Sequence, residues 1–195
     1  MWDKKLKKFN IILASGSPRR KQFFEDLALN VSISVKTIEE VYPSELQASE
    51  ISDYLAELKA SQFVNTLNTN DIVITSDTVV WHQQKSLEKP VNEQEAYQMI
   101  KTLSNDWHDV ITSVCFTTKT SQITLNNTTK VKFKALTDDE IWFYIHNYKP
   151  FDKAGAYGIQ EWIGLIGITE IKGSYANVVG LPTHLVYKTL IAMAN

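Results

Sequence analysis

The sequence predicts an α/β or α+β domain, and three observations lead to that prediction. Short β-prone apolar runs interleave with stretches whose apolar residues recur at helical spacing. No internal repeat, low-complexity tract or long linker interrupts the chain of 195 residues. That length, with 44% apolar and 22% charged residues, is sufficient for one domain with a substantial core. We therefore expect residues 1–195 to form a single domain, with or without two lobes.

The composition argues against several classes of protein. A formal net charge of −2 does not suit the broad basic surface of a nucleic-acid-binding protein and favours a small anionic ligand. The single cysteine, Cys115, excludes an intramolecular disulfide, and with the four histidines it shows no zinc-ligand spacing. No run approaches the roughly 20 apolar residues of a membrane helix, and the apolar run after residues 1–8 is too short for a signal peptide. We expect a cytoplasmic protein that binds neither nucleic acid nor membrane.

Residues 10–29 predict a strand, a polar turn and a helix. The apolar run at residues 9–13 is typical of a buried strand, and the apolar residues at 23–27 recur at helical spacing. Ser17 followed by Pro18 is typical of a helix start, because the serine oxygen accepts a hydrogen bond from an unpaired N–H and proline loses nothing at the first helical position. The sequence thus places a helix N-terminus directly after the turn.

Four donor side chains gather at this helix start, namely Ser15, Ser17, Arg19 and Arg20. Unpaired helix amides attract anions, and guanidinium groups match phosphate oxygens. The pattern predicts a phosphate cradle and an ordinary capped surface helix about equally well. It is neither a P-loop nor a three-glycine dinucleotide fingerprint.

The remaining elements follow from periodicity and capping patterns. Strands are expected at residues 31–35, 71–81, 110–117, 123–133 and 165–171, and helices at residues 49–64, from 92, from 137 and at 183–194. Asn92 with Glu95 and Thr137 with Glu140 form capping-box patterns at two helix starts. The buried face of the helix at 49–64 is assigned to Ile51, Tyr54, Leu55 and Leu58, and the packing of the helix from 137 to Ile141, Phe143, Tyr144 and Ile145.

Asp77 stands in the middle of the β-prone run at residues 71–81, where aspartate is disfavoured. It marks either a bulge or hairpin turn at Ser76-Asp77, or a carboxylate displayed to hold a metal ion. The acidic pair Glu39-Glu40 and the isolated lysines Lys59 and Lys89 complete the parts of a magnesium-dependent phosphate enzyme. Taken singly, each of these two glutamates and two lysines is better explained as a solvated surface residue, and only their joint occurrence argues for a site.

Several motifs in one order closely resemble the Maf family of nucleoside triphosphate pyrophosphatases, from about residue 11 to the C-terminus. They are Leu13-Ala14-Ser15-Gly16-Ser17-Pro18-Arg19-Arg20, Leu55-Ala56-Glu57-Leu58-Lys59-Ala60, Asp77-Thr78-Val79-Val80, Glu88-Lys89-Pro90, Asp152-Lys153-Ala154-Gly155-Ala156-Tyr157-Gly158-Ile159-Gln160 and residues 173–182. The resemblance implies a mixed sheet flanked by helices, related to inosine triphosphate pyrophosphatases, with a cleft between two lobes. It also implies hydrolysis of a nucleoside triphosphate between its α and β phosphates with a divalent cation, Mg²⁺ or Mn²⁺, and suggests a homodimer.

The resemblance also assigns roles to individual residues. Asp77 is implied to be the catalytic acidic residue, as proton acceptor or metal ligand, with Glu40 as a second metal ligand. The implied phosphate-binding residues are Ser15, Ser17, Arg20, Lys59 and Lys89. Arg19, Thr78 and Gln160 fall at the positions implied to determine specificity, in a combination that resembles the branch acting on dTTP and UTP. Amide and guanidinium donors suit the carbonyl-rich edge of uracil or thymine.

The chain departs from that pattern at three places. Ser76 replaces a more usual alanine, Asn105 a usual glycine, and Glu161-Trp162 a small-residue turn beside Gln160. The last departure bears on base selectivity, so an enzyme of the same family that acts on another base, for example on 7-methyl-GTP, is an alternative. A nucleotide-binding regulator of cell division and septum formation without turnover is an alternative of a different class. A DNA-binding protein is disfavoured by the acidic net charge.

Overall fold

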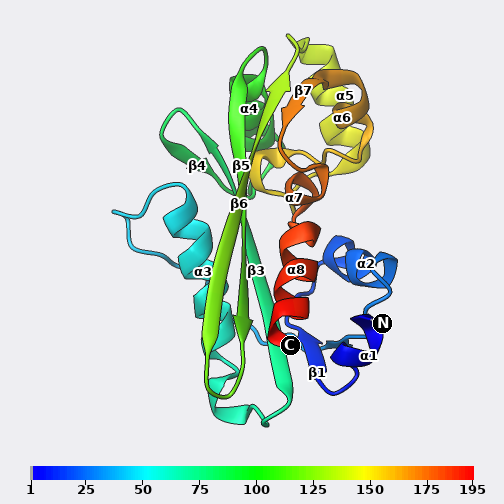
Figure 1. The fold of residues 1–195 in the computed structure, drawn as a ribbon. Coiled ribbons are helices and arrows are strands. Elements are labelled where there is room, and N and C mark those ends of the chain that lie inside the picture. The colour runs from blue at the N-terminus through cyan, green and yellow to red at the C-terminus, as the bar shows by residue number, and fades with distance from the viewer. Residues whose placement is uncertain (1) are drawn as a thin grey trace. The chain divides into compact units, whose positions relative to one another are not determined.

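The structure is a computed structural model that describes residues 2–195, so only Met1 of the expected domain lies outside it. Its seven-stranded sheet has the order β2-β1-β3-β5-β6-β7, with β4 paired to β3 (Figure 1). The strands are β1 Asn10–Leu13, β2 Ser32–Ile33, β3 Asp71–His82, β4 Lys85–Leu87, β5 Trp107–Thr117, β6 Gln122–Phe133 and β7 Ile168–Lys172. β1 is parallel to β2 and β3, whereas the pairs β3–β4 and β6–β7 are antiparallel. The mixed sheet with interleaved helices confirms the α/β prediction.

Helices interleave with these strands along the chain. They are α1 Trp2–Leu6, α2 Pro18–Asp26, α3 Ser49–Ser61, α4 Glu93–Leu103, α5 Asp138–Tyr148, α6 Trp162–Gly167, α7 Tyr175–Val179 and α8 Thr183–Met193, with short 3-10 helices at Val64–Thr66 and Ala154–Ala156. The predictions of α2, α3, α4, α5 and α8 are confirmed, whereas α1, α6 and α7 were not predicted. Within the described residues, no helix combines the length and apolar character needed to cross a membrane.

The chain divides into two compact units by its internal packing. Unit 1 comprises the chain up to Asp77 together with Thr112–Asn127 and Gly180–Asn195, and unit 2 comprises Thr78–Ile111 and Thr128–Val179. Strands β3, β5 and β6 each contribute residues to both units. Each unit has its own apolar core and is described separately below.

In unit 1 the two faces of β3 pack against different helices (Figure 1). Ile72 and Ile74 are fully buried in a cluster with Phe24 of α2 and Leu190 of α8. Because successive side chains of a strand point to opposite faces, the odd-numbered residues of β3 point the other way, toward α3. The Thr75 hydroxyl accordingly donates to the carbonyl of Ala56 in α3 at 2.7 Å. Asp77 shares this face.

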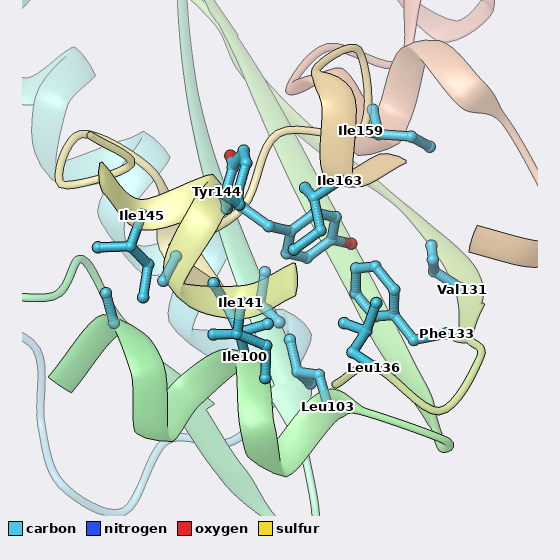
Figure 2. Packing of buried hydrophobic residues seen from close by; sticks show 14 of the residues in the cluster. Ile100, Leu103, Val131, Phe133, Leu136, Ile141, Tyr144, Ile145, Ile159 and Ile163 are labelled. Atoms are coloured by element: carbon cyan, nitrogen blue, oxygen red, sulfur yellow. The ribbon is translucent and has the colours of Figure 1, made fainter. Parts of the chain in front are cut away.

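In unit 2 the core forms between β6 and helices α4, α5 and α6 (Figure 2). The largest contributors are Ile100, Leu103, Phe133, Ile141, Tyr144, Ile145 and Ile163, all fully buried. Full burial of one such side chain stabilises the folded state by roughly 1.5–3 kcal/mol. The core therefore anchors α5 and α6, which flank the glycine-rich segment ending at Gln160.

One interpretation of Ser76-Asp77 is excluded and one predicted strand is partly wrong. β3 continues through Ser76 and Asp77, so these residues do not form a hairpin turn. The strand expected at residues 165–171 begins only at Ile168, because the chain first forms α6. In α6, Ile163 is buried while Leu165 is 79% exposed, and Gly164 lies so close to the Ile159 carbonyl that no side chain would fit.

The remaining differences concern boundaries and the assignment of buried residues. β2 has two residues rather than the five expected, and β5 begins three residues earlier than expected, at Trp107. Tyr54 and Phe143 are exposed although they were assigned to buried faces, because the buried stripes of α3 and α5 are centred on other residues. These are Ile51, Ser52, Leu55, Ala56 and Ala60 in α3, and Ile141, Tyr144 and Ile145 in α5.

The capping predictions are confirmed. The Asn92 side chain accepts a hydrogen bond from the Glu95 N–H at 2.9 Å, and Thr137 with Glu140 forms a complete capping box. Asn105, which departs from the family pattern, has φ 62° in the left-handed region. Asparagine tolerates this conformation better than most residues with a side chain, so it replaces the usual glycine at little cost.

Candidate functional site

The turn from β1 into α2 is held by the hydroxyl groups of Ser15 and Ser17. Ser15 Oγ accepts a hydrogen bond from the Ser17 N–H at 3.2 Å, and Ser17 Oγ accepts one from the Arg20 N–H at 3.4 Å. Ser17 is the N-cap of α2, and Pro18 occupies its first turn, as the sequence predicts. A Cβ on Gly16 would meet no atom within 4 Å, so the backbone of the turn borders open space. The turn therefore presents a helix N-terminus to which an anion has access.

Arg20 ties this turn to two other segments of unit 1. Its Nε donates to the Gly180 carbonyl at 2.8 Å, and its Nη1 donates to the Ser76 carbonyl at 2.9 Å. Nη1 also lies 3.4 Å from Ser15 Oγ. Burial lowers the pKa of the guanidinium, and the negative charge of Asp77 opposes that shift. Arg20 thus fixes the turn between β1 and α2 against β3. The sequence alone did not predict this structural role.

Helix α3 is docked on the sheet through polar contacts. Besides the bond from Thr75 to α3, Ser113 Oγ of β5 lies 2.7 Å from Ser52 Oγ and 2.6 Å from Asp53 Oδ1. Ala56 and Ala60 are fully buried against Cys115, and their small side chains allow the helix to approach the strands closely. The position of α3 relative to β3 is therefore set by directional hydrogen bonds as well as by packing.

The consequence of this docking is an ion cluster centred on Lys59. Lys59 Nζ lies 2.6 Å from Asp77 Oδ1 and 3.0 Å from Glu40 Oε1. The Lys59 and Asp77 side chains are 17% and 11% exposed, whereas Glu40 is 42% exposed. A largely buried carboxylate and an ammonium group thus stabilise each other, and removal of either would leave the other uncompensated.

The ammonium group of Lys59 indicates how the two carboxylates could hold a metal ion. It occupies a position where one cation contacts both Asp77 and Glu40. Among residues 2–195, no group of three or more His, Cys, Asp or Glu side chains is placed to hold a metal. Mg²⁺ is usually bound by one or two carboxylates together with substrate phosphates and waters rather than by a complete protein cage. The donor set of this chain fits such a site.

Three other residues implied by the resemblance belong to unit 2. Thr78 follows Asp77 directly in β3, Lys89 is exposed after β4, and Gln160 is exposed before α6. The segments around them meet at Gly155, whose N–H donates to the Glu88 carbonyl at 3.1 Å. A Cβ there would lie 3.0 Å from Val80, and the residue has φ 68°. Glycine is therefore required where these segments pack together.

Known proteins resemble this chain over nearly its whole length. The family model described as Maf-like protein matches residues 10–193, which is nearly the whole chain. The chain belongs to the Maf family. This Maf-like protein is 58% identical over 193 residues to a protein of Flavobacterium johnsoniae, with 99% of this chain and 100% of that protein covered. It is 57% identical to one of Christiangramia forsetii, with 97% of each covered, and 48% identical to one of Phocaeicola vulgatus, with 95% and 96% covered. All three carry the name dTTP/UTP pyrophosphatase.

A solved structure supports the fold independently of the sequence. The Ham1 protein of Staphylococcus aureus has a TM-score of 0.52 with this Maf-like protein, covering 94% of this chain and 99% of that one. Sequence identity is 14%, so this likeness concerns the fold alone.

In this Maf-like protein, unit 1 brings together most of the residues that the motifs implied. Ser15 and Arg20 are in contact, Arg20 and Asp77 interact electrostatically, and Asp77 and Glu40 share Lys59. Sequence reasoning missed Thr75, whose hydroxyl fixes α3 two residues before Asp77. The signal was present, since a threonine at an odd-numbered position of β3 shares the face of Asp77.

Proposed function

We propose that this Maf-like protein hydrolyses dTTP and UTP to the nucleoside monophosphate and pyrophosphate with the help of a divalent cation. The reaction would remove unwanted or modified pyrimidine nucleotides from the nucleotide pool. The observation that carries the proposal is the ion cluster of Lys59, Asp77 and Glu40 beside the Ser15–Ser17 turn. The names of relatives that align over nearly the full chain support the same reaction and substrates.

In this proposal most of the residues that bind the triphosphate belong to unit 1. The N-terminus of α2 and the hydroxyls of Ser15 and Ser17 contact phosphate oxygens, with Arg20 holding the turn in place. Lys59 neutralises negative charge on the phosphates, as does Lys89. A Mg²⁺ or Mn²⁺ ion, held by Asp77 and Glu40, would supply further charge neutralisation when bound.

The reaction breaks one bond and forms one. A water oxygen attacks the α-phosphorus, the bond from that phosphorus to the α–β bridging oxygen breaks, and pyrophosphate leaves with that oxygen. Asp77 accepts a proton from the attacking water, or else serves only as a metal ligand. Lys59 Nζ, 2.6 Å from Asp77 Oδ1, holds this carboxylate in place.

Selectivity is assigned to Arg19, Thr78 and Gln160. The amide of Gln160 and the guanidinium of Arg19 offer donors to the two carbonyl groups of uracil and thymine, which cytosine and purine bases do not present in the same arrangement. We also propose a homodimer, supported by the family resemblance, and a cytoplasmic location, for which the buried unpaired Cys115 is the supporting observation. Light scattering of the purified protein tests the dimer.

The decisive experiment measures pyrophosphate release from dTTP, UTP, dCTP and 7-methyl-GTP with Mg²⁺ or Mn²⁺. We expect turnover of dTTP and UTP to exceed that of the others, and Asp77→Asn to lower kcat by roughly 10²–10⁴-fold. Nucleotide binding without pyrophosphate release would instead support the regulator of cell division. Preference for 7-methyl-GTP would overturn the pyrimidine assignment while leaving the reaction intact.

Calorimetric titration with Mn²⁺ separates the two roles of Asp77. If the carboxylate holds the ion, Asp77→Asn and Glu40→Gln both weaken Mn²⁺ binding in the presence of dTMP and pyrophosphate. If Asp77 acts only as a base, Asp77→Asn leaves Mn²⁺ affinity unchanged and lowers kcat alone.

A further inference from the structure

The segment that carries Gln160 is held by three side chains of unit 2 that the proposed reaction does not use. The Tyr144 hydroxyl donates to Glu161 Oε2 and accepts from the Gly158 N–H at 3.0 Å. Lys153 Nζ lies 3.1 Å from Glu161 Oε1. We refer to Tyr144, Lys153 and Glu161 as the clasp. It reaches the backbone on both sides of Gln160, at Gly158 and at Glu161.

The members of the clasp are largely shielded from water. Tyr144 is fully buried in the core of unit 2 (Figure 2), and the Lys153 and Glu161 side chains are 10% and 19% exposed. Burial and the neighbouring carboxylate raise the pKa of the Tyr144 hydroxyl, so it stays neutral and continues to donate. Shielded charge-assisted hydrogen bonds are stronger and more directional than exposed ones. The clasp is therefore a stiff element of the structure.

The backbone around Gln160 is constrained by close packing as well. The Glu161 N–H donates to the Gly158 carbonyl at 3.0 Å, which closes a tight turn. A Cβ on Gly158 would lie 2.8 Å from Glu161 Cδ, and a Cβ on Gly164 would lie 1.9 Å from the Ile159 carbonyl oxygen. Ile159 is 5% exposed, whereas Gln160 is exposed. Gln160 is thus an exposed side chain on a turn whose backbone is fixed before and after it.

Glu161 lies where the turn around Gln160 joins α6. It is the N-cap residue of α6, but its side chain makes no capping hydrogen bond. The carboxylate instead contacts Tyr144 and Lys153. A carboxylate held on two sides by largely shielded partners points to a function in fixing the turn.

We propose that Tyr144, Lys153 and Glu161 are positioning residues for Gln160, and that they determine selectivity for the nucleotide base more than the rate of bond cleavage. This inference rests on the proposed function, in which Gln160 contacts the base. A carboxamide carries both donors and an acceptor, so it distinguishes a carbonyl from an amino group only when its direction is fixed. A loosened turn would let Gln160 rotate and accept cytosine as well as thymine.

The test compares Tyr144→Phe with Tyr148→Phe. The first keeps the ring in the core and removes the hydroxyl that contacts Glu161 and Gly158. The second makes the same change on the same helix, at a ring stacked 5.2 Å from that of Tyr144. We expect Tyr144→Phe to lower the ratio of kcat/KM for dTTP to that for dCTP by roughly tenfold, because a freely rotating Gln160 loses the discrimination that one oriented hydrogen bond to the base provides. Tyr148→Phe should leave the ratio unchanged.

A second measurement does not depend on catalysis. Hydrogen exchange of the Gly158 amide, followed by NMR, should be roughly tenfold faster in Tyr144→Phe than in the unmodified protein, and unchanged in Tyr148→Phe. Glu161→Gln keeps an acceptor for Tyr144 but loses the charge opposite Lys153, so we expect intermediate effects on exchange and selectivity.

The outcomes distinguish this inference from the proposed function. Unchanged exchange at Gly158 would overturn the clasp, and an equal loss of kcat/KM for dTTP and dCTP would show a merely structural role. Faster exchange with an unchanged ratio would overturn the link to selectivity. If the unmodified protein does not prefer dTTP to dCTP, the proposed function fails, and that failure is seen before any variant is made.

Discussion

The two units of this Maf-like protein differ in the polar pairs that lie near their cores. Unit 1 places ions in its partly shielded site, where Lys59 lies between the carboxylates of Asp77 and Glu40. Unit 2 also contains a shielded ion pair, Lys153–Glu161, but the polar pair within its apolar core is neutral, with His108 Nε2 2.7 Å from the Tyr157 hydroxyl beside the ring of Phe133. Charged side chains can stabilise the charge that develops on a substrate during a reaction, whereas hydrogen bonds between neutral buried side chains hold those side chains in one arrangement. In the proposed function the ion cluster of unit 1 takes part in the chemistry, whereas the neutral pair of unit 2 is structural.

Among the tests of this difference between the units, the largest effect should follow removal of the central cation of unit 1. Lys59→Met leaves Asp77 and Glu40 without their shared partner and removes a charge that neutralises phosphate. We expect kcat/KM for dTTP to fall by roughly 10²–10³-fold, with partial recovery in Lys59→Arg. Steady-state kinetics test this, with Lys21→Met as control, because the pair of Lys21 with Glu25 is exposed. Comparable activity in Lys59→Met and Lys21→Met would refute a catalytic ion cluster.

Acid should lower the stability of the folded protein, because His108 is buried in its neutral form in unit 2. Burial lowers the pKa of His108 from 6.5 to about 3, and the charge of His82 acts in the same direction, opposed by Asp106. The unfolded chain binds a proton at this histidine below pH 6.5, but the folded protein does not until about pH 3. His108 therefore lowers stability as pH falls through that window, by about 1.4 kcal/mol per pH unit.

Urea unfolding between pH 7 and pH 4 measures this slope. In His108→Gln the histidine proton is no longer taken up on unfolding, so the pH dependence should be shallower. The same slope in both proteins would mean that His108 is protonated in the folded state and that the interior of unit 2 tolerates charge.

The docking of α3 offers a smaller test in unit 1. Thr75→Val keeps the shape of the side chain and removes the hydrogen bond to Ala56. We expect a loss of about 1 kcal/mol in unfolding free energy, and a lower kcat because Lys59 and Asp77 lose their register. Thr75→Ser keeps the donor and should retain more of kcat than Thr75→Val. If kcat is equal in the two variants, the hydroxyl does not position α3.

The smallest expected effect concerns an unpaired hydroxyl. Within the described residues, Ser76 Oγ is buried without a hydrogen-bond partner, a position where the family more often has alanine. Ser76→Ala should leave stability unchanged or raise it by up to about 1 kcal/mol, which is roughly 2–4 °C in Tm. The matched change Ser113→Ala removes a hydroxyl bonded to Ser52 and Asp53 and should destabilise. Calorimetry that ranks the two variants in the opposite order would contradict this reading of β3.

Local patterns predicted much of the fold because capping and periodicity act over a few residues. The Ser17-Pro18 helix start, the Thr137 capping box and the β-prone run that begins at Asp71 all follow from neighbours in sequence. α6 was missed because an apolar run with two glycines is ambiguous between helix and strand. Its choice depends on the approach of Gly164 to the Ile159 carbonyl, a contact that periodicity does not encode.

By itself, the sequence determined the interleaved strands and helices, the helix start beside Ser15 and the family, because residue types and spacing carry that information directly. Only the tertiary structure decided the partners of the charged and polar groups. In the folded chain, Arg20 donates hydrogen bonds to the Ser76 and Gly180 carbonyls. Lys59 lies between two carboxylates, and Glu161 accepts a hydrogen bond from Tyr144. The reason is physical: a side chain's partner depends on which distant segments pack beside it, and only the folded chain brings those segments together.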